Sequence, residues 1–424
     1  MSPLTITIII LLLTIAAFMS GKMPFSLIAT GIILSLILTK VLTPAQALSG
    51  FVNQNVAMFV AMFVIGAGLT KTSILSKAQL IVLRYKTHPK ILIFIASFVA
   101  ALLAILTSAT VAAAVMLPLI IGIANEVDIS RSKILFPAMV VANIVTGMTF
   151  LGQGASNMAF SDIMMKTGGT IPFTIWSFAI ARLPYFFIAI IYVSVIGWRL
   201  LPDIPNSQFQ DNIKKQEQKS LGKMKENLAY LIICATVVSM LFAKQLHTPM
   251  FVLAALGACA LVLFGVLTEK EALGSIHLPT VFLFAGVLPL SHAIKVTGAG
   301  NVVANEMLML LGNSTNPYFI MAVFFIVPLI MTQLMSNLAT ITIFIPLVSA
   351  AAVKIGVDPR ALVMGVLIAG STSIMTPMAA PAQTIIMGPG GYQLKDYLKA
   401  SLPLVIIITA FSIFFLPVLF PFHG

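Results

Sequence analysis

Long runs of apolar residues, separated by short polar loops, constrain this chain more than any other feature of its sequence. Several runs are close to twenty residues long, which is the length of helix that crosses the roughly 30 Å hydrocarbon core of a bilayer. Only 8% of the 424 residues are charged, against about 25% in a soluble domain. These features predict an all-α polytopic membrane protein and exclude a nucleic-acid binder or a disulfide scaffold.

Basic residues gather in a few loops beside the apolar runs, and such loops usually face the cytoplasm. Residues 71–90 contain five basic residues and no acidic one, so we place this loop inside. Following the chain from there gives ten crossings, puts 17 of the 24 Lys and Arg residues inside and leaves both termini outside the cell membrane. The predicted crossings are residues 3–20, 23–40, 54–70, 134–161, 184–198, 227–243, 250–267, 279–296, 361–387 and 401–421.

Two further apolar segments are too long for one crossing. Residues 91–125 are uncharged and would form a helix of about 52 Å, yet both of their flanks must lie inside. The chain therefore enters the membrane and returns, with polar residues at its midpoint. Residues 307–353 repeat this pattern from the outside. We predict two re-entrant helical hairpins, with the first tip at Thr107, Ser108 and Thr110 and the second at Ser336 and Asn337.

The two halves of the chain resemble each other at a spacing of about 225 residues. The matching pairs include Pro24 with Pro249, Thr43 with Thr268, and Ser108 with Ser336. Each half makes five crossings, which is an odd number, so the second half must lie inverted relative to the first. Inverted repeats with broken helices are typical of secondary transporters. We divide the chain into a first inverted repeat (1–198), a cytoplasmic linker (199–226) and a second inverted repeat (227–424).

Each half has a second polar interruption after its hairpin. Gly152 and Gly154 loosen the first, and Pro377 and Pro381 break the second. An interruption divides a helix into two half-helices. The half-helix that begins there exposes N–H groups, which favour anions, and the half-helix that ends there exposes carbonyls, which favour cations. No charged residue falls within the four interruptions. We therefore expect an uncharged pocket near the bilayer midplane, in which co-bound cations offset the charge of an anion.

The hairpin tips and the breaks Ala155-Ser156-Asn157 and Pro381-Ala382-Gln383 resemble those of the divalent-anion/sodium symporter family, within the wider ion-transporter superfamily. The resemblance covers nearly the whole chain. It implies a homodimer that moves dicarboxylates, citrate or sulfate with sodium by an elevator motion. Together with the positions of the interruptions, the resemblance implies that the substrate is bound by Ser108, Thr110, Asn157, Ser336, Asn337, Thr376 and Gln383. Sodium sites are implied at Thr107, Ser108, Gly152, Gly154, Thr332, Ser336, Asn337 and Ala380.

The tips depart from the pattern of that family at two positions. Ala109 stands where the family has an asparagine, and Leu338 stands where it has a threonine. The first tip thus lacks an amide and the second lacks a hydroxyl, so we expect two unequal cation sites.

The resulting prediction is a cation-coupled anion transporter, not an enzyme, with sodium as coupling ion and no other cofactor. A sodium/proton antiporter or an exporter of metalloid or inorganic anions is the alternative. It is disfavoured because no membrane-embedded carboxylate is available to carry a proton. An intramembrane hydrolase built on Ser156 lacks an evident histidine partner.

Arg182 lies within the otherwise apolar run 171–198. The equivalent region of the second half, 392–401, carries Lys395 and Lys399. We therefore expect both regions to form amphipathic arms at the membrane surface, with the membrane helices resuming at Pro184 and Pro403.

Overall fold

The computed structural model describes residues 1–20, 23–74, 77, 80, 82, 89–126, 129–149, 151–206, 221–243, 245–276, 278–299, 302, 316–334, 336–377 and 379–422. This part of the chain is all-helical, as predicted, and contains no strand. Most of the predicted linker (207–220) and the start of the second predicted hairpin segment lie outside the described residues.

Over the described residues, the first half contains eleven helices and the second half contains nine, with the short 3-10 turns η1 and η2 included. They are α1 (Pro3–Ser20), α2 (Phe25–Leu38), α3 (Pro44–Leu48), α4 (Gln54–Thr70), α6 (Pro89–Leu106), α7 (Ala109–Glu126), α8 (Ser132–Val145), η1 (Gly152–Ser156), α9 (Asn157–Lys166), α10 (Ile175–Val195), η2 (Gly197–Leu200), α11 (Lys223–Leu241), α12 (Met250–Leu263), α13 (Glu269–Ser275), α14 (Leu278–Val296), α16 (Pro317–Leu334), α17 (Asn337–Ile355), α18 (Arg360–Ser371), α19 (Pro381–Gly390) and α20 (Leu394–Leu419).

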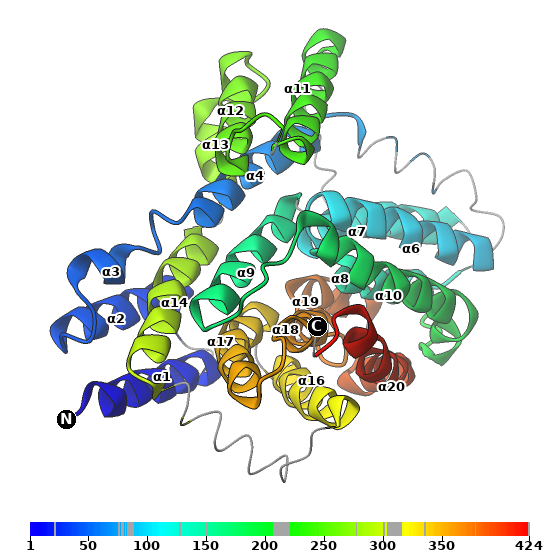
Figure 1. Cartoon of the computed structure of the whole chain (residues 1–424). Helices are drawn as coiled ribbons and strands as arrows, with labels where there is room; N and C mark the ends of the chain where they lie inside the picture. The colour runs from blue at the N-terminus through cyan, green and yellow to red at the C-terminus, as the bar shows by residue number, and fades with distance from the viewer. Residues whose placement is uncertain are drawn as a thin grey trace.

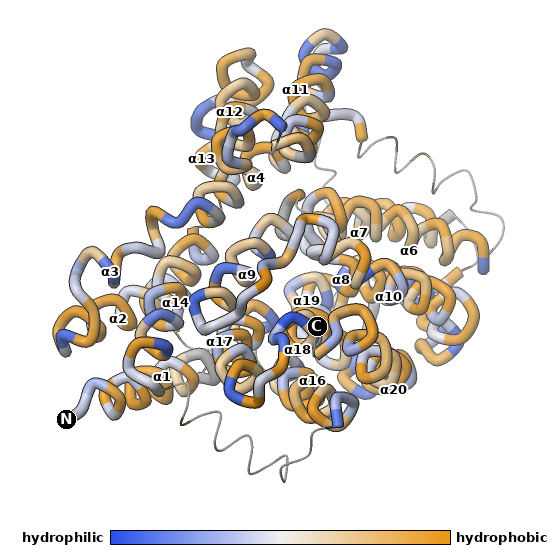
Figure 2. Tube along the Cα trace, in the orientation of Figure 1, coloured by the Kyte–Doolittle hydropathy of each residue, from blue (hydrophilic) through white to orange (hydrophobic). Residues whose placement is uncertain are grey.

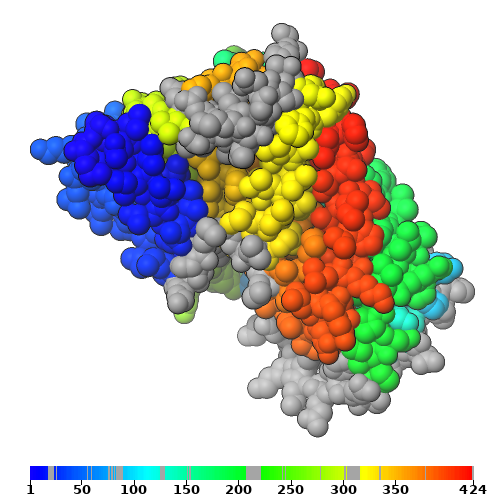
Figure 3. All heavy atoms as spheres, turned by 90° about the horizontal axis from the view of Figure 1, so that it is seen from below, coloured from blue at the N-terminus to red at the C-terminus, as the bar shows by residue number. Residues whose placement is uncertain are grey.

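The helices form two groups (Figure 1). The frame group contains α1–α4 and α11–α14, in which α2 packs on α14 and α4 packs on α12. The core group contains α6–α10 and α16–α20, in which α6 packs on α8 and α16 packs on α18. Seen from below, the blue N-terminal helices lie on the left and the yellow-to-red C-terminal helices lie in the middle and on the right (Figure 3). Helices α4 and α14 of the frame group contact η1, α9 and α17 of the core group. Each group therefore takes helices from both halves of the sequence.

Apolar residues cover most helices, and polar residues concentrate at helix ends and loops (Figure 2). Five described helices are long and apolar enough to cross a membrane: Pro89–Leu106, Ile175–Val195, Leu278–Val296, Asn337–Ile355 and Leu394–Leu419. Together with the shorter apolar helices, they agree with a multi-pass membrane protein.

The expected arms before Pro184 and Pro403 are wrong. Helix α10 begins at Ile175, is capped by Thr174, and continues through Pro184 to Val195. Helix α20 likewise runs from Leu394 through Pro403 to Leu419. Within a bundle of helices, a proline inside a membrane helix is tolerated because neighbouring groups satisfy the freed carbonyl. The two regions are thus parts of long helices.

Loops that the topology places on one side of the membrane do lie together. Lys71, after α4, forms an ion pair with Glu271 on α13. The backbone N–H of Ser73 donates to Glu226 at the start of α11 (3.1 Å). Lys133 similarly pairs with Asp203, in the first part of the predicted linker. These contacts support the predicted grouping of loops.

Two short helices share one capping arrangement at the predicted repeat spacing. Thr43 accepts a hydrogen bond from the backbone of Gln46 (3.3 Å), whose side chain accepts one from Thr43 (3.0 Å). Thr268 and Glu271 form the same capping box with the same two distances. The matching threonines in the sequence therefore begin equivalent helices.

Candidate functional site

The first predicted hairpin tip separates α6 from α7. Helix α6 ends at Leu106 and α7 begins at Ala109. The Ser108 hydroxyl accepts a hydrogen bond from the Val111 backbone N–H (3.2 Å) and so caps α7. Thr107 is buried and donates to the Leu103 carbonyl (2.6 Å), whereas Thr110 is exposed. The tip is therefore a helix end followed by a capped helix start, as the polar midpoint predicted.

The second tip has the same construction. Ser336 has an extended backbone before α17, and its hydroxyl accepts a hydrogen bond from the Ala339 N–H (3.3 Å). Asn337 is the first residue of α17, and its side-chain oxygen accepts a hydrogen bond from the Leu338 N–H (2.7 Å). The start of α17 thus carries the partial positive charge of a helix N-terminus, and two of its N–H groups, those of Leu338 and Ala339, are bonded to side chains.

The break in the first half lies between α8 and α9. After α8, Gly147 adopts a left-handed conformation with φ of 84°, and its carbonyl accepts a hydrogen bond from the Asn157 side chain (2.6 Å). Gly152 begins η1. Gly154 must be a glycine, because a Cβ there would lie 1.7 Å from the Thr149 carbonyl oxygen.

The break in the second half lies between α18 and α19 and is bonded to the second tip. Gln333, near the end of α16, donates to the Thr372 carbonyl and accepts from the Met375 N–H, each at 3.0 Å. Thr376 donates to the Gln333 carbonyl (2.7 Å). Thr332 lies 3.4 Å from the Gly370 carbonyl oxygen and donates to it. Tip and break of this half therefore form one polar unit.

The remaining predicted residues of the second break lie at the start of α19. Ala380 precedes α19 with an extended backbone. Gln383 is fully buried, and neither its side-chain oxygen nor its side-chain nitrogen has a hydrogen-bond partner among the described residues. Helix α19 packs on α7, which follows the first tip.

The two breaks are joined directly. Asn143, near the end of α8, donates its side-chain amide to the carbonyls of Ser371 (3.1 Å) and Ser373 (3.2 Å). Thr149 donates to the carbonyl of Ile105 (2.9 Å), which connects the first break to the first tip. All four predicted interruptions therefore lie within one bonded region of the core group.

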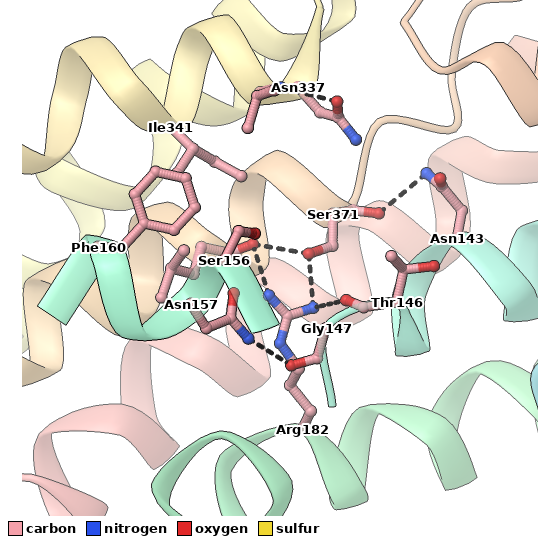
Figure 4. A pocket seen from close by; sticks show the side chains of 12 residues that line it. Asn143, Thr146, Gly147, Ser156, Asn157, Phe160, Arg182, Asn337, Ile341 and Ser371 are labelled. Atoms are coloured by element: carbon pink, nitrogen blue, oxygen red, sulfur yellow. Dashed lines mark hydrogen bonds between the residues drawn. The ribbon is translucent and has the colours of Figure 1, made fainter. Parts of the chain in front are cut away.

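A pocket opens between the first break and the second tip (Figure 4). Its space is about 400 Å³ when the open mouth is included. Its apolar lining residues are Phe160, Leu338, Ile341 and Leu367. Its polar lining residues are Asn143, Thr146, Gly147, Ser156, Asn157, Arg182, Asn337 and Ser371, of which Asn337 lies across from Asn157 and Arg182 (Figure 4).

Two of the predicted substrate residues, Asn157 and Asn337, line this pocket from the first turns of α9 and α17. The start of α17 and the start of α9, which follows η1 directly, thus converge on it. The other predicted residues lie around it in the tips and breaks: Thr107, Ser108, Thr110, Gly152, Gly154, Thr332, Ser336, Thr376, Ala380 and Gln383 are not among its lining residues.

The expectations of an uncharged pocket and of an interfacial Arg182 are wrong. Arg182 is 3% exposed and reaches the pocket from α10. Its guanidinium donates to the carbonyls of Thr146 (2.7 Å) and Leu367 (3.1 Å). The sequence does show that an arginine stands within a long apolar run, but the proposed repeat alignment placed it in an arm.

Sequence reasoning also missed Asn143, Thr146, Gly147, Phe160 and Ser371 as lining residues. The spacing Asn143-x-x-Thr146-Gly147, directly before a glycine-rich break, is a local signal for the first three. No comparable sequence signal marks Phe160 or Ser371.

Comparison with known proteins gives a consistent result. A family model described as citrate transporter matches residues 15–367. The uncharacterized transporter YfbS of Escherichia coli is 32% identical over 195 residues, 46% of this chain but only 31% of that protein, so the match spans less than a third of the relative. The sodium-dependent dicarboxylate transporter SdcS of Staphylococcus aureus is 23% identical over 393 residues, covering 84% of this chain and 74% of SdcS.

Among solved structures, the YdaH transporter of Alcanivorax borkumensis has the same fold. The TM-score is 0.67 at 14% identity, over 99% of this chain and 100% of YdaH.

Proposed function

Because the chain belongs to the citrate transporter family, we propose that it carries a small divalent anion, such as a di- or tricarboxylate, across the cell membrane together with sodium. The observation that carries this proposal is the convergence of Asn157 and Asn337 on one pocket. Each asparagine is the first residue of a helix, where the helix dipole and the side-chain amide favour an anion. The similarity to SdcS supports a dicarboxylate and sodium.

The pocket lining suits such a substrate, because it combines polar and apolar residues. Asn157, Asn337 and the start of α17 hold the carboxylates, while Phe160 and Leu338 contact the carbon skeleton. Leu338, which stands in place of the expected threonine, is one of these apolar residues. A proton-coupled mechanism receives no support here, because none of the residues lining the pocket is Asp or Glu.

Sodium completes the charge balance of the proposed cycle. A divalent anion entering a cell at about −100 mV meets an opposing field of roughly 4.6 kcal/mol, so co-transported cations are needed for uptake. We assign them to the tip and break of each half, at Thr107, Ser108, Gly152 and Gly154 in the first half and at Thr332, Ser336, Asn337 and Ala380 in the second. The remaining candidates, Thr110, Thr376 and Gln383, are proposed to contact substrate at another stage of the cycle.

We propose that transport proceeds by an elevator motion in which the core group moves against the frame group. Asn157 and Asn337 both belong to the core group, so the bound anion would travel with it. The frame group would then provide the contact of a homodimer. In this arrangement both termini lie outside and the central linker lies in the cytoplasm.

Uptake into proteoliposomes tests the function. Labelled succinate, citrate and sulfate are offered with an inward sodium gradient or with choline in its place. We expect one anion to accumulate with sodium and to equilibrate slowly without it. Uptake that is equal in the two salts would rule out sodium coupling, and uptake of none of the anions would rule out the substrate class.

A further inference from the structure

The guanidinium of Arg182 lies where the ends of two interrupted helices meet. In the first half it donates to the carbonyls of Ile144 (3.3 Å) and Thr146 (2.7 Å), at the C-terminus of α8. In the second half it donates to the carbonyl of Leu367 (3.1 Å) and to the hydroxyl of Ser371 (2.6 Å), in the last turn of α18. One side chain therefore bonds to the same end of both breaks.

These acceptors form an environment for a cation. The C-terminus of a helix carries free carbonyls and about half a negative charge, so two such ends together attract about one positive charge. In membrane transporters, carbonyls at the ends of unwound helices coordinate the coupling ion. Here the amino groups of Arg182 occupy that position.

No carboxylate balances this charge in the part of the chain that the structure describes. Arg182 forms no salt bridge there, and the residues that line the pocket with it include no Asp or Glu. A buried charge without a partner is costly, so it is retained only where something offsets it. The helix ends do so in part, and an anion in the adjacent pocket would do the rest.

We propose that Arg182 is a built-in cation that replaces one mobile coupling ion at the junction of α8 and α18. The inference has a second part, which rests on the proposed function: the fixed charge of Arg182 attracts the substrate anion and lowers the number of sodium ions needed for transport. Its first part, a cation site filled by a side chain, stands independently of the substrate.

Two substitutions test the first part without any substrate. Arg182→Ala removes the charge and opens space among the carbonyls, whereas Arg182→Met removes the charge and fills the space. The matched control is Arg131→Ala, since Arg131 is equally buried (1% exposed) but lies at the other end of α8, away from the two helix C-termini. The melting temperature of each purified protein is measured in choline chloride and across a sodium chloride titration, with no anionic substrate present.

We expect Arg182→Ala to gain a saturable sodium-dependent rise in melting temperature about 3 °C larger than that of the wild type. Arg182→Met and Arg131→Ala should follow the wild type. If Arg182→Ala can be purified in a folded state only when sodium is present, that outcome supports the proposal even more strongly. Equal sodium responses in all four proteins would overturn the proposal, as would an Arg182→Ala protein that folds in neither salt, because sodium then does not replace the guanidinium.

Succinate uptake tests the second part. In proteoliposomes, the sodium dependence of uptake by Arg182→Ala should become steeper, with a Hill coefficient about one unit above that of the wild type. An unchanged Hill coefficient would contradict the proposal that Arg182 replaces one sodium ion in the transport cycle. If wild-type protein takes up no anion while the thermal result holds, the proposed function fails and the cation site remains.

Discussion

Asn143 donates its side-chain amide to the Ser371 carbonyl at 3.1 Å and thereby joins the last turn of α8 to the end of α18. The same amide donates to the carbonyl and the hydroxyl of Ser373, at 3.2 and 3.1 Å. A single buried side chain therefore connects the break of the first half with the break of the second. This contact keeps the two interruptions side by side next to the pocket.

Replacing Asn143 by leucine should separate the two breaks. The variant leaves buried carbonyls without their donor, at a cost of about 1–3 kcal/mol, and it should lower both the melting temperature and anion uptake. The control is Ser97→Ala, because the Ser97 hydroxyl is buried but has no hydrogen-bond partner among the described residues. Thermal unfolding and uptake are measured for both. If Asn143→Leu behaves like Ser97→Ala, the amide does not hold the breaks together.

Gly154→Ala should abolish the fold of the first break. The added Cβ would lie 1.7 Å from the Thr149 carbonyl oxygen and 3.1 Å from the Gly147 Cα, so the backbone must shift, at a cost of about 3 kcal/mol or more. Gly122→Ala is the matched control, since a Cβ there meets nothing within 4 Å inside α7, and alanine should stabilise that helix slightly. The yield and the melting temperature of the two purified variants are measured, and both should be lower for Gly154→Ala. A tolerated Gly154→Ala would show that the break relaxes easily.

Asn337→Ala should weaken substrate binding more than it weakens the fold. Asn337 is partly buried at the pocket edge, so its removal costs little packing but takes away an amide at the anion site. We expect the Kd for the transported anion to rise at least about tenfold, which corresponds to about 1.4 kcal/mol. Asn316→Ala provides the comparison, because Asn316 precedes α16 in an exposed position outside the pocket. A Kd that changes equally in the two variants would argue against a substrate contact.

The sequence was sufficient to predict where the polar interruptions fall, for a physical reason that the structure makes visible. Ile105 lies three residues before Ser108, and Gln333 lies three residues before Ser336. Their carbonyls accept equivalent hydrogen bonds from Thr149 and Thr376. Polar residues in an apolar run are costly unless they are bonded, so their positions mark where the chain leaves the regular helix.

The buried position of Arg182 could not be predicted from the sequence. Whether an arginine in an apolar run reaches the surface or turns inward depends on acceptors supplied by α8 and α18, which are distant in the sequence. The same holds for Ser371, whose role depends on packing between the two halves. Local patterns thus predicted helices and breaks, whereas identifying the polar residues that line the pocket required the three-dimensional arrangement of those helices.

An elevator motion should be blocked by a bond between the two helix groups. The side-chain amide of Asn53, which precedes α4, donates to Asp162 on α9 (2.8 Å) across the boundary between frame and core. Cysteines at both positions, with Cys234 and Cys259 replaced by alanine, should form a disulfide that stops uptake until it is reduced. The control pair is Ser130 with Asp203, whose side chains are hydrogen-bonded away from this boundary, between the residues before α8 and those after η2, so a disulfide there should leave uptake intact. Full activity of the oxidised Asn53–Asp162 pair would exclude relative motion at this boundary.

The ion pair between Lys71 and Glu271 should contribute stability that is lost in acid. The hydrogen bond from Lys71 lowers the pKa of Glu271 from its ordinary value to about 2. A lowered pKa means that the folded protein holds its proton less tightly than the unfolded chain, so the contribution is complete above about pH 4.5 and is lost as the pH falls toward 2. Both side chains are more than a third exposed, so we expect less than about 1 kcal/mol, decreasing with salt. Melting curves of wild type, Glu271→Gln and the neighbouring Glu269→Gln at pH 7, 5 and 3 provide the measurement. The difference between wild type and Glu271→Gln should shrink at pH 3, while Glu269→Gln follows the wild type; a difference that grows at pH 3 would contradict the sign of the linkage.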